Sequence, residues 1–184
     1  MAPMPVSTED HGAPHFLLIT WLGLYHAGTP GTQGGDNSTL KLDLKNVPQP
    51  DAFLRILPSC GGQSRTVDGY VEGAPELTAE IAASSENYDL HDKLQAYRRN
   101  GVCEYVVWRV LDREIDWFIL RDGEYERLSA DADGICRSEV FPGLWLEPNS
   151  LISGELGPVL DVLQRGLATP EHAAFVERLR AARR

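Results

Sequence analysis

Several features that would assign this chain to a class are missing from its 184 residues. No apolar run approaches the roughly 18 residues that a membrane-spanning helix requires, so we expect no association with a membrane. The N-terminus carries Glu9 and Asp10 and has no basic segment before an apolar stretch, which argues against a signal peptide. Cys60, Cys103 and Cys136 form no Cys-x-x-Cys pair, and no His or Cys cluster predicts a zinc hydrolase. Reduced, structural thiols in a cytoplasmic protein are therefore expected.

Basic residues are also in short supply. The chain has 17 Lys and Arg against 27 Asp and Glu, which gives a net charge of −10. A protein that coats nucleic acid would be basic, so this class is disfavoured, although an enzyme with a locally positive cleft is not. Hydrophobic content of 42% and charged content of 24% are those of an ordinary globular chain. The length predicts a single domain over 14–184, preceded by a flexible segment over 1–13.

The most informative part of the sequence is the stretch 76–97, which predicts a buried strand running into a helix. Alternation along the strand puts Glu76, Thr78 and Glu80 on one face and three apolar side chains on the other. Ser84 or Ser85 is a suitable N-cap for an amphipathic helix over 86–99. The strand therefore carries acids on a face that would otherwise be apolar.

Those acids need partners, because a carboxylate on a buried strand is costly unless a metal ion or a lysine pairs with it. Lys93 follows on the helix after Glu80. A further acid, Asp51, stands directly after Pro50 at the head of another expected strand. Two carboxylates and a lysine that converge near strand ends predict a metal-assisted phosphoryl-transfer site.

The other elements follow from periodicity and from turn residues. The glycine-rich stretch 31–37 lacks the Gly-Lys-Ser/Thr end of a phosphate loop, so it predicts a turn without a nucleotide site. The near-continuous apolar run 103–111 predicts a strand buried on both faces. If it lies parallel to strand 76–82, the two should be joined by a right-handed crossover. The remaining expected elements are a helix over 15–27, strands 38–44 and 51–57 joined as a hairpin, a loop over 58–70, a hairpin over 115–128 around an Asp-Gly turn, a strand over 138–146 broken by Pro142-Gly143, and helices over 154–167 and 170–183.

Several short motifs occur in a fixed order along the chain. They are Pro50-Asp51, Pro75-Glu76-Leu77 with Glu80-Ile81 and Ser84, Asp89 with Lys93 and Tyr97, Gly101-Val102 with Glu104-Tyr105 and Val107, and Phe141-Pro142-Gly143-Leu144. The acids and the lysine resemble the PD-(D/E)XK nuclease superfamily. The full set is more closely similar to its Uma-type endonuclease-like family, bacterial restriction-endonuclease-like domains of mostly unassigned function. The resemblance spans roughly His15 to Ile152.

The resemblance implies an α/β (α+β) fold, with a restriction-endonuclease-like mixed sheet flanked by helices and an antiparallel hairpin extension. It implies a Mg²⁺- or Mn²⁺-dependent endonuclease that hydrolyses DNA phosphodiester bonds, often as a homodimer. Asp51 and Glu80 correspond to the metal-binding acids and Lys93 to the catalytic lysine. The commoner superfamily pattern has this lysine two residues after the second acid, where this sequence has Ala82. The Uma-type pattern moves the lysine to the following helix.

Simpler interpretations of the same residues stay open. Lys93 could form a surface ion pair with Asp89, which lies four residues earlier on the same helix. Glu80 could be a structural partner of Lys93 without a metal, and Asp51 could simply end a turn. Tyr97 is interpreted more simply as a core residue than as a catalytic one.

The alternative function is a non-catalytic interaction or dimerisation module on the same fold. The acidic composition and Ala82 favour this alternative. Such a module could associate through the hairpin near Trp117 or through the terminal helices.

Overall fold

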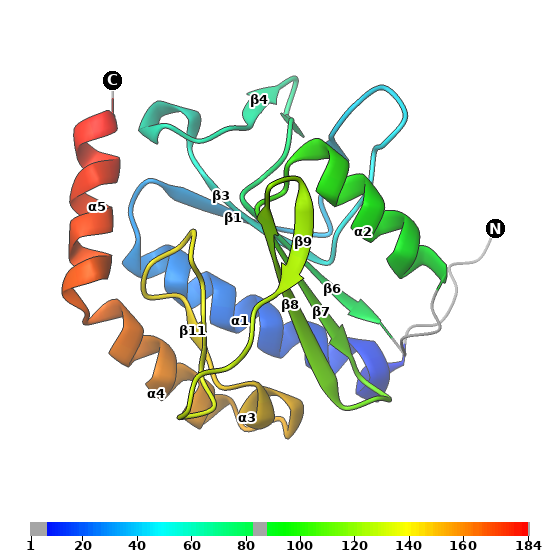
Figure 1. Cartoon of the computed structure of the whole chain (residues 1–184), viewed down its shortest axis with the longest axis vertical. Helices are drawn as coiled ribbons and strands as arrows, with labels where there is room; N and C mark the ends of the chain where they lie inside the picture. The colour runs from blue at the N-terminus through cyan, green and yellow to red at the C-terminus, as the bar shows by residue number, and fades with distance from the viewer. Residues whose placement is uncertain (1–6, 83–87, 184) are drawn as a thin grey trace.

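The centre of the protein is a mixed sheet with strand order β1-β3-β6-β7-β8-β9 (Figure 1). The structure is a computed structural model that describes residues 7–82 and 88–183. Strands β6 and β7 run parallel, and every other neighbouring pair in this sheet is antiparallel. The strands are β1 (Thr32–Asp36), β3 (Ala52–Ile56), β6 (Leu77–Ala82), β7 (Glu104–Arg109), β8 (Glu114–Arg121) and β9 (Glu124–Arg127). The expected mixed α/β fold is confirmed.

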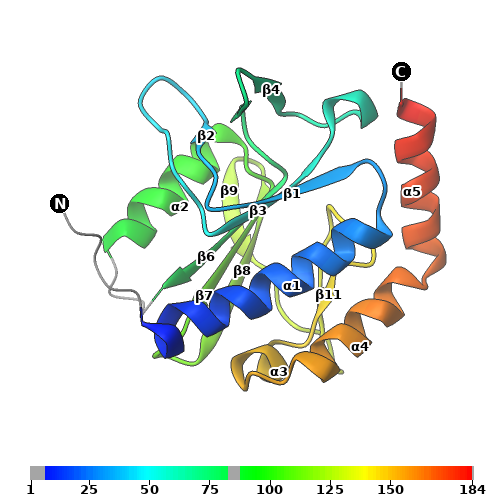
Figure 2. The same ribbon diagram turned by 180° about the vertical axis from the view of Figure 1, so that it is seen from behind.

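Helices cover both faces of this sheet. Figure 2 shows α1 (Ala13–Gly28) crossing in front of the sheet, with α2 (Tyr88–Asn100) on the far side. The C-terminal helices α3 (Pro148–Ile152), α4 (Leu156–Leu167) and α5 (Pro170–Ala182) pack around the α1 side. None of the helices formed by the described residues has the length and apolar character needed to span a bilayer.

The predicted alternation along β6 is confirmed and explains how the two faces differ. Leu77, Ala79 and Ile81 belong to the large core cluster that includes α1. Thr78 and Glu80 are buried on the opposite face, beneath α2. The interior on the α2 side is therefore partly polar.

The segment from 31 to 44 was predicted wrongly. The glycine-rich stretch forms strand β1, and this strand, not 38–44, is the antiparallel partner of β3. Only β2 (Leu40–Lys41) is extended within 38–44, and it pairs parallel with β5 (Tyr70–Glu72) in a small sheet completed by β4 (Arg65–Val67). Gly35 marks close packing here, because a Cβ atom on it would lie 2.1 Å from the Phe53 ring.

The region 136–152 also differs from the expected single broken strand. Strands β10 (Cys136–Arg137) and β11 (Trp145–Leu146) pair with each other across the intervening turn. Gly143 in this turn has φ +87°, a left-handed conformation that suits glycine. The short helix α3 follows, and the sequence analysis did not predict it.

Two glycines on α4 should respond oppositely to alanine. A Cβ atom on Gly166 would lie 2.2 Å from the carbonyl oxygen of Gly143, whereas one on Gly157 would meet nothing within 4 Å. We expect Gly166→Ala to destabilise the protein by about 1–3 kcal/mol through overpacking. Gly157→Ala should stabilise it by up to about 1 kcal/mol through helix propensity. Urea unfolding of both variants measures this contrast, and equal shifts would contradict it.

Candidate active site

Asp51, the residue directly before β3, lies beside Glu80 of the neighbouring strand β6. The register of β3 and β6 pairs Ala52 with Ala79, so one further step along both strands pairs Asp51 with Glu80. Opposite residues of an antiparallel pair share a face, with Cβ atoms about 4.5–5.5 Å apart. Consistent with this placement, one carboxylate oxygen of Asp51 accepts a hydrogen bond from the Ile81 backbone N–H at 2.7 Å. Both acids are buried.

Helix α2 supplies two partners to Glu80. The Lys93 ammonium lies 3.0 Å from one carboxylate oxygen, and the Tyr97 hydroxyl donates to the other at 2.8 Å. Burial raises the pKa of Glu80 to about 7, with the nearby Asp51 charge acting in the same direction and Lys93 and Tyr97 opposing. Spacing of four residues on a helix puts Lys93 and Tyr97 on one side of α2, above the sheet. The structure thus brings Asp51, Glu80 and Lys93 into one polar cluster.

Two histidines that the sequence analysis did not single out also reach Asp51. His11 lies in a short helical turn, η1 (Thr8–Gly12), and its Nε2 is 3.2 Å from the Asp51 carboxylate. His15 Nε2 lies 3.1 Å from the Asp51 backbone oxygen and 2.9 Å from Asp36, and the two rings stack at 5.7 Å. Their spacing of four residues was the available signal, because it places both rings on one side of the N-terminal helix.

Tyr97 combines the core position expected for it with a polar contact. Its ring is fully buried in the α2-side cluster, and its hydroxyl fixes one oxygen of Glu80. Tyr97→Phe removes only that hydroxyl, so we expect about 10–100-fold weaker Mn²⁺ binding or activity at nearly unchanged stability. Calorimetric titration with Mn²⁺ and a cleavage assay measure the two effects. Unchanged affinity together with unchanged activity would show that the hydroxyl does not serve the site.

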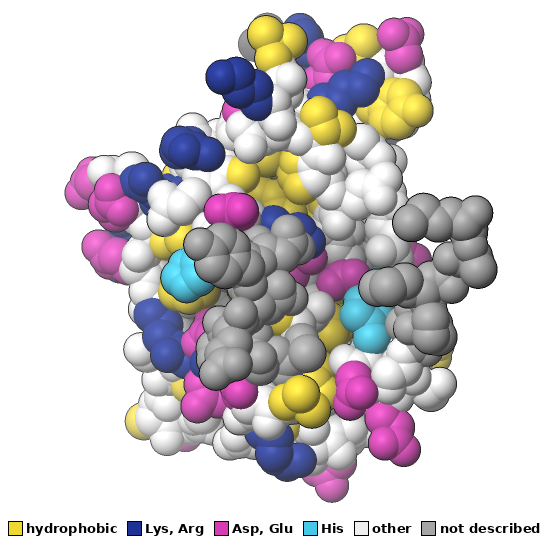
Figure 3. All heavy atoms as spheres, turned by 90° about the vertical axis from the view of Figure 1, so that its right-hand side faces the viewer, with side chains coloured by type: hydrophobic (Ala, Val, Ile, Leu, Met, Phe, Trp, Pro, Cys, Tyr) yellow, Lys and Arg dark blue, Asp and Glu magenta, His cyan; other side chains and the backbone are white. Residues whose placement is uncertain are grey.

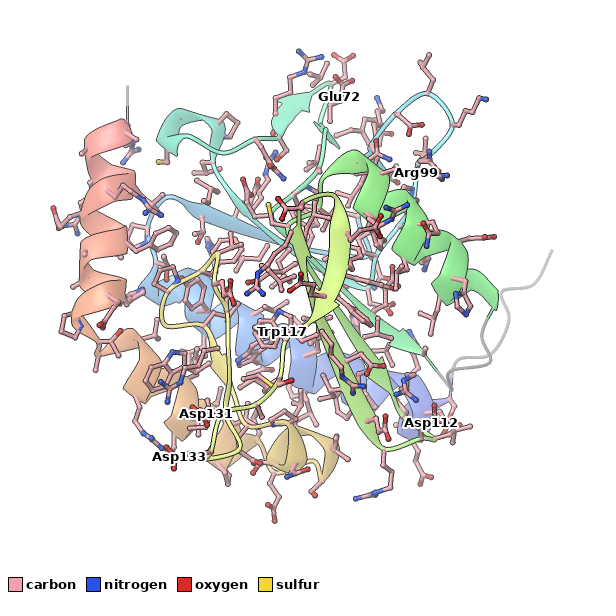
Figure 4. All side chains as sticks on the ribbon, in the orientation of Figure 1. Glu72, Arg99, Asp112, Trp117, Asp131 and Asp133 are labelled. Carbon is pink, nitrogen blue, oxygen red and sulfur yellow. The ribbon has the colours of Figure 1, made fainter. Side chains whose placement is uncertain are left out.

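Two other buried acids accept hydrogen bonds from other parts of the protein. The two carboxylate oxygens of Glu76 accept from the backbone N–H groups of Ile56 at 2.8 Å and Gln63 at 3.0 Å, so the role of Glu76 is structural. Glu104 accepts from the indole of Trp117, labelled near the middle of the molecule in Figure 4, and from the Ser138 hydroxyl. It also accepts two backbone N–H groups of the segment that follows Ser138.

The donor set fits a hard cation better than a zinc ion. Within residues 7–82 and 88–183, no group of three or more His, Cys, Asp or Glu side chains is arranged to hold a metal. Mg²⁺ commonly takes only one or two protein carboxylates and keeps several waters. Asp51 and Glu80 supply that number, and a cation between them would offset the cost of burying both. Ser84 and the Asp89 side chain, which bear on the capping and ion-pair interpretations, lie outside the described part.

The side of the molecule that lies to the right in Figure 1, where α2 is found, carries charges of both signs. Figure 3 shows Lys and Arg side chains scattered among Asp and Glu side chains on this side. The polar cluster therefore lies in a setting of mixed charge. Any positive field that attracts a phosphate must be local, and Lys93 supplies a positive charge 3.0 Å from the Glu80 carboxylate.

The mixed sheet with helices on both faces defines an α/β protein. The solved structure described as a "putative nuclease belonging to DUF820 from Anabaena variabilis ATCC 29413" is similar in fold, with a TM-score of 0.63 at 13% identity. That match covers 83% of this chain and 84% of the other.

The family model described as "Uma2: Putative restriction endonuclease" matches residues 1–149. The chain therefore belongs to the Uma2 family, as the sequence motifs implied. No curated protein matches the chain.

Proposed function

We propose that this protein is a Mg²⁺-dependent endonuclease, also served by Mn²⁺, that hydrolyses DNA phosphodiester bonds with Asp51, Glu80 and Lys93. The observation that carries the proposal is the pairing of two buried carboxylates, one of them held by a lysine at 3.0 Å. Membership of a family described as a restriction endonuclease supports the same chemistry.

Asp51 and Glu80 are the residues that would hold the metal ion. When bound there, the ion would offset charge on the phosphate and lower the pKa of water at the site. The Ile81 N–H and the Tyr97 hydroxyl each fix one carboxylate oxygen, so the two acids are held in place before any ligand arrives. Such preorganisation saves reorganisation energy during the reaction.

Lys93 would serve the phosphate directly. Its side chain is 22% exposed, so the ammonium can contact both Glu80 and a substrate in the solvent-facing part of the site. A positive charge there would stabilise the negative charge that develops on the phosphate oxygens. The length of the lysine side chain explains how a residue on α2 can replace one at the position of Ala82.

Cleavage of plasmid and single-stranded DNA with Mg²⁺ or Mn²⁺ tests this function. Cleavage should require the metal and be lost in Asp51→Asn. Calorimetry with Mn²⁺ separates this function from the non-catalytic module, because the latter predicts no heat that depends on Asp51. Metal-dependent cleavage that persists in Asp51→Asn would remove the proposed site.

We further infer that the enzyme works as a homodimer in the cytoplasm. Two copies would supply one site for each strand of a duplex. Cys60, Cys103 and Cys136 are all free thiols, as befits a reducing compartment. Light scattering of the purified chain with and without DNA tests the dimer, and a monomer under both conditions would contradict it.

A further inference from the structure

A buried arginine, Arg55, lies on β3 outside the polar cluster of Asp51 and Glu80. The residue is only 2% exposed, yet the described part of the chain places no carboxylate in an ion pair with it. Its guanidinium donates instead to three uncharged side chains, Gln33, Ser64 and Thr66. A fully buried arginine is uncommon unless it is paired, because its charge has lost the stabilisation that water gives. An anionic ligand would therefore compensate the buried positive charge of Arg55.

Arg55 lines a cavity of about 310 Å³ between the edge of the main sheet and the small sheet. Gln33, Thr39 and Thr66 line the same cavity, and none of the described residues that line it is acidic. This lining contrasts with a chain whose net charge is −10. Gly35 of β1 lies on the same face as Gln33 and adds no side chain to this space.

The polar groups of this cavity are arranged as donors. Thr66 accepts from Arg55 at 2.6 Å, and Thr39 accepts from Gln49 at 2.7 Å, so each hydroxyl retains its own proton to donate. The side-chain oxygen of Gln33 accepts from Arg55 at 2.8 and 2.5 Å, which leaves the amide NH₂ as a donor. Gln33, Thr39 and Thr66 thus each retain a proton for donation to a ligand in the cavity.

Glu76, the buried acid whose charge acts on Arg55, does not fill this role. Glu76 acts on Arg55 through its field and raises the pKa of the guanidinium, whereas burial, the larger effect, lowers it. Both Glu76 oxygens are engaged by backbone N–H groups of Ile56 and Gln63, and Glu76 is not among the residues that line the cavity. The cavity therefore keeps a net positive character.

We propose that this cavity binds a phosphate-type oxyanion, held by the charge of Arg55 and by donors from Gln33, Thr39 and Thr66. Charge-assisted hydrogen bonds to a planar guanidinium are the usual means of phosphate recognition. The site does not depend on the proposed cleavage reaction and uses none of its residues.

Two sources could deliver such a phosphate. Arg55 lies on β3, four residues after Asp51 and on the same face of the chain, a separation of about 13 Å in extended backbone. A DNA strand bound at Asp51 and Glu80 could place a neighbouring backbone phosphate there. Alternatively, the ligand is a free phosphate or a mononucleotide. The chemistry recognised is the same in both cases.

Titration of the full chain with inorganic phosphate tests the site directly. The experiment uses EDTA, so that no divalent metal is present, and chloride to keep the ionic strength constant. At a phosphate concentration ten times its Kd, the melting temperature should rise by about 3–6 °C. Arg55→Met should abolish the rise. Thr66→Val, a substitution at an exposed residue that retains Arg55, should weaken phosphate binding about 10-fold.

Arg65→Met is the matched control, because Arg65 is exposed on β4 and pairs with Glu72. It should leave the effect of phosphate unchanged. If a single-stranded oligonucleotide displaces phosphate, the site belongs to the DNA backbone. If phosphate stays bound in the presence of the oligonucleotide, the site belongs to a free phosphate ligand. Absence of a rise in the parent protein, or an equal rise in Arg55→Met and Thr66→Val, would overturn the proposal. None of these outcomes bears on metal-dependent cleavage.

Discussion

Replacing Glu80 by glutamine should lower the rate of Mg²⁺-dependent DNA cleavage by at least about 10²–10³-fold, which is the usual cost of removing a preorganised charged group. The substitution keeps the shape of the side chain and its ability to accept from Tyr97. It removes the negative charge that would hold the metal and that pairs with Lys93 at 3.0 Å. A cleavage assay with purified Glu80→Gln measures the loss.

The stability of the same variant separates a functional carboxylate from a structural one. Burial raises the pKa of Glu80 to about 7, so the folded environment favours a neutral group at this position. The Lys93 side chain is 22% exposed, so water can replace the contact that it makes with the Glu80 carboxylate. Glu80→Gln should therefore keep the melting temperature of the parent while losing activity. A structural ion pair without a metal would give the reverse: lower stability and unchanged cleavage.

Glu76→Gln is the matched control, because Glu76 lies on the same face of the chain four residues before Glu80. Its carboxylate is committed to two backbone N–H groups, so the variant should lose stability and keep the cleavage rate of its folded fraction. Lys93→Ala should reproduce the loss seen in Glu80→Gln to within about tenfold. Full cleavage activity in Glu80→Gln would contradict the proposed mechanism.

The part of the candidate site on β6 and α2 could be predicted from the sequence, because it depends on local periodicity. Alternation along β6 placed Glu80 opposite the apolar face, and helical spacing placed Lys93 and Tyr97 on one side of α2. Both periodicities are set by backbone geometry within a single element. The contacts of Glu80 with Lys93 and Tyr97 agree with them.

The rest depends on pairing between distant segments, which periodicity does not encode. Gly34 and Gly35 look like turn residues, yet they form an edge strand because the Phe53 ring lies against Gly35. The contact between His11 and Asp51 spans 40 residues and follows from where the N-terminal helix crosses the sheet. The burial of Arg55 and its uncharged partners likewise depend on segments outside β3, with Gln33 on β1 and Thr66 on β4.

The largest effect on stability should come from Glu104. Its side chain is fully buried and accepts hydrogen bonds from Trp117 and Ser138 and from the backbone N–H groups of Glu139 and Val140, at 2.8–3.2 Å. Burial raises the pKa of Glu104, and these four donors oppose the shift. Glu104→Ala leaves the buried donors of Trp117 and Ser138 without an acceptor and also removes the acceptor of two partly buried backbone N–H groups, so we expect a loss of about 3–5 kcal/mol.

Glu104→Gln should cost less, because one oxygen remains to accept from the backbone of Glu139 and Val140. The new amide group can donate to the Ser138 hydroxyl but must face the indole N–H of Trp117, leaving one buried donor unpaired at about 1–3 kcal/mol. For a chain of this length these losses correspond to melting temperatures lower by about 6–20 °C for alanine and 2–12 °C for glutamine. Glu114→Gln, exposed at the start of β8, should change stability by less than about 0.5 kcal/mol. An equal melting temperature for Glu104→Gln and the parent protein would contradict this expectation. The segment that follows β10 would then be held by its apolar contacts alone, through Phe141 and Leu144.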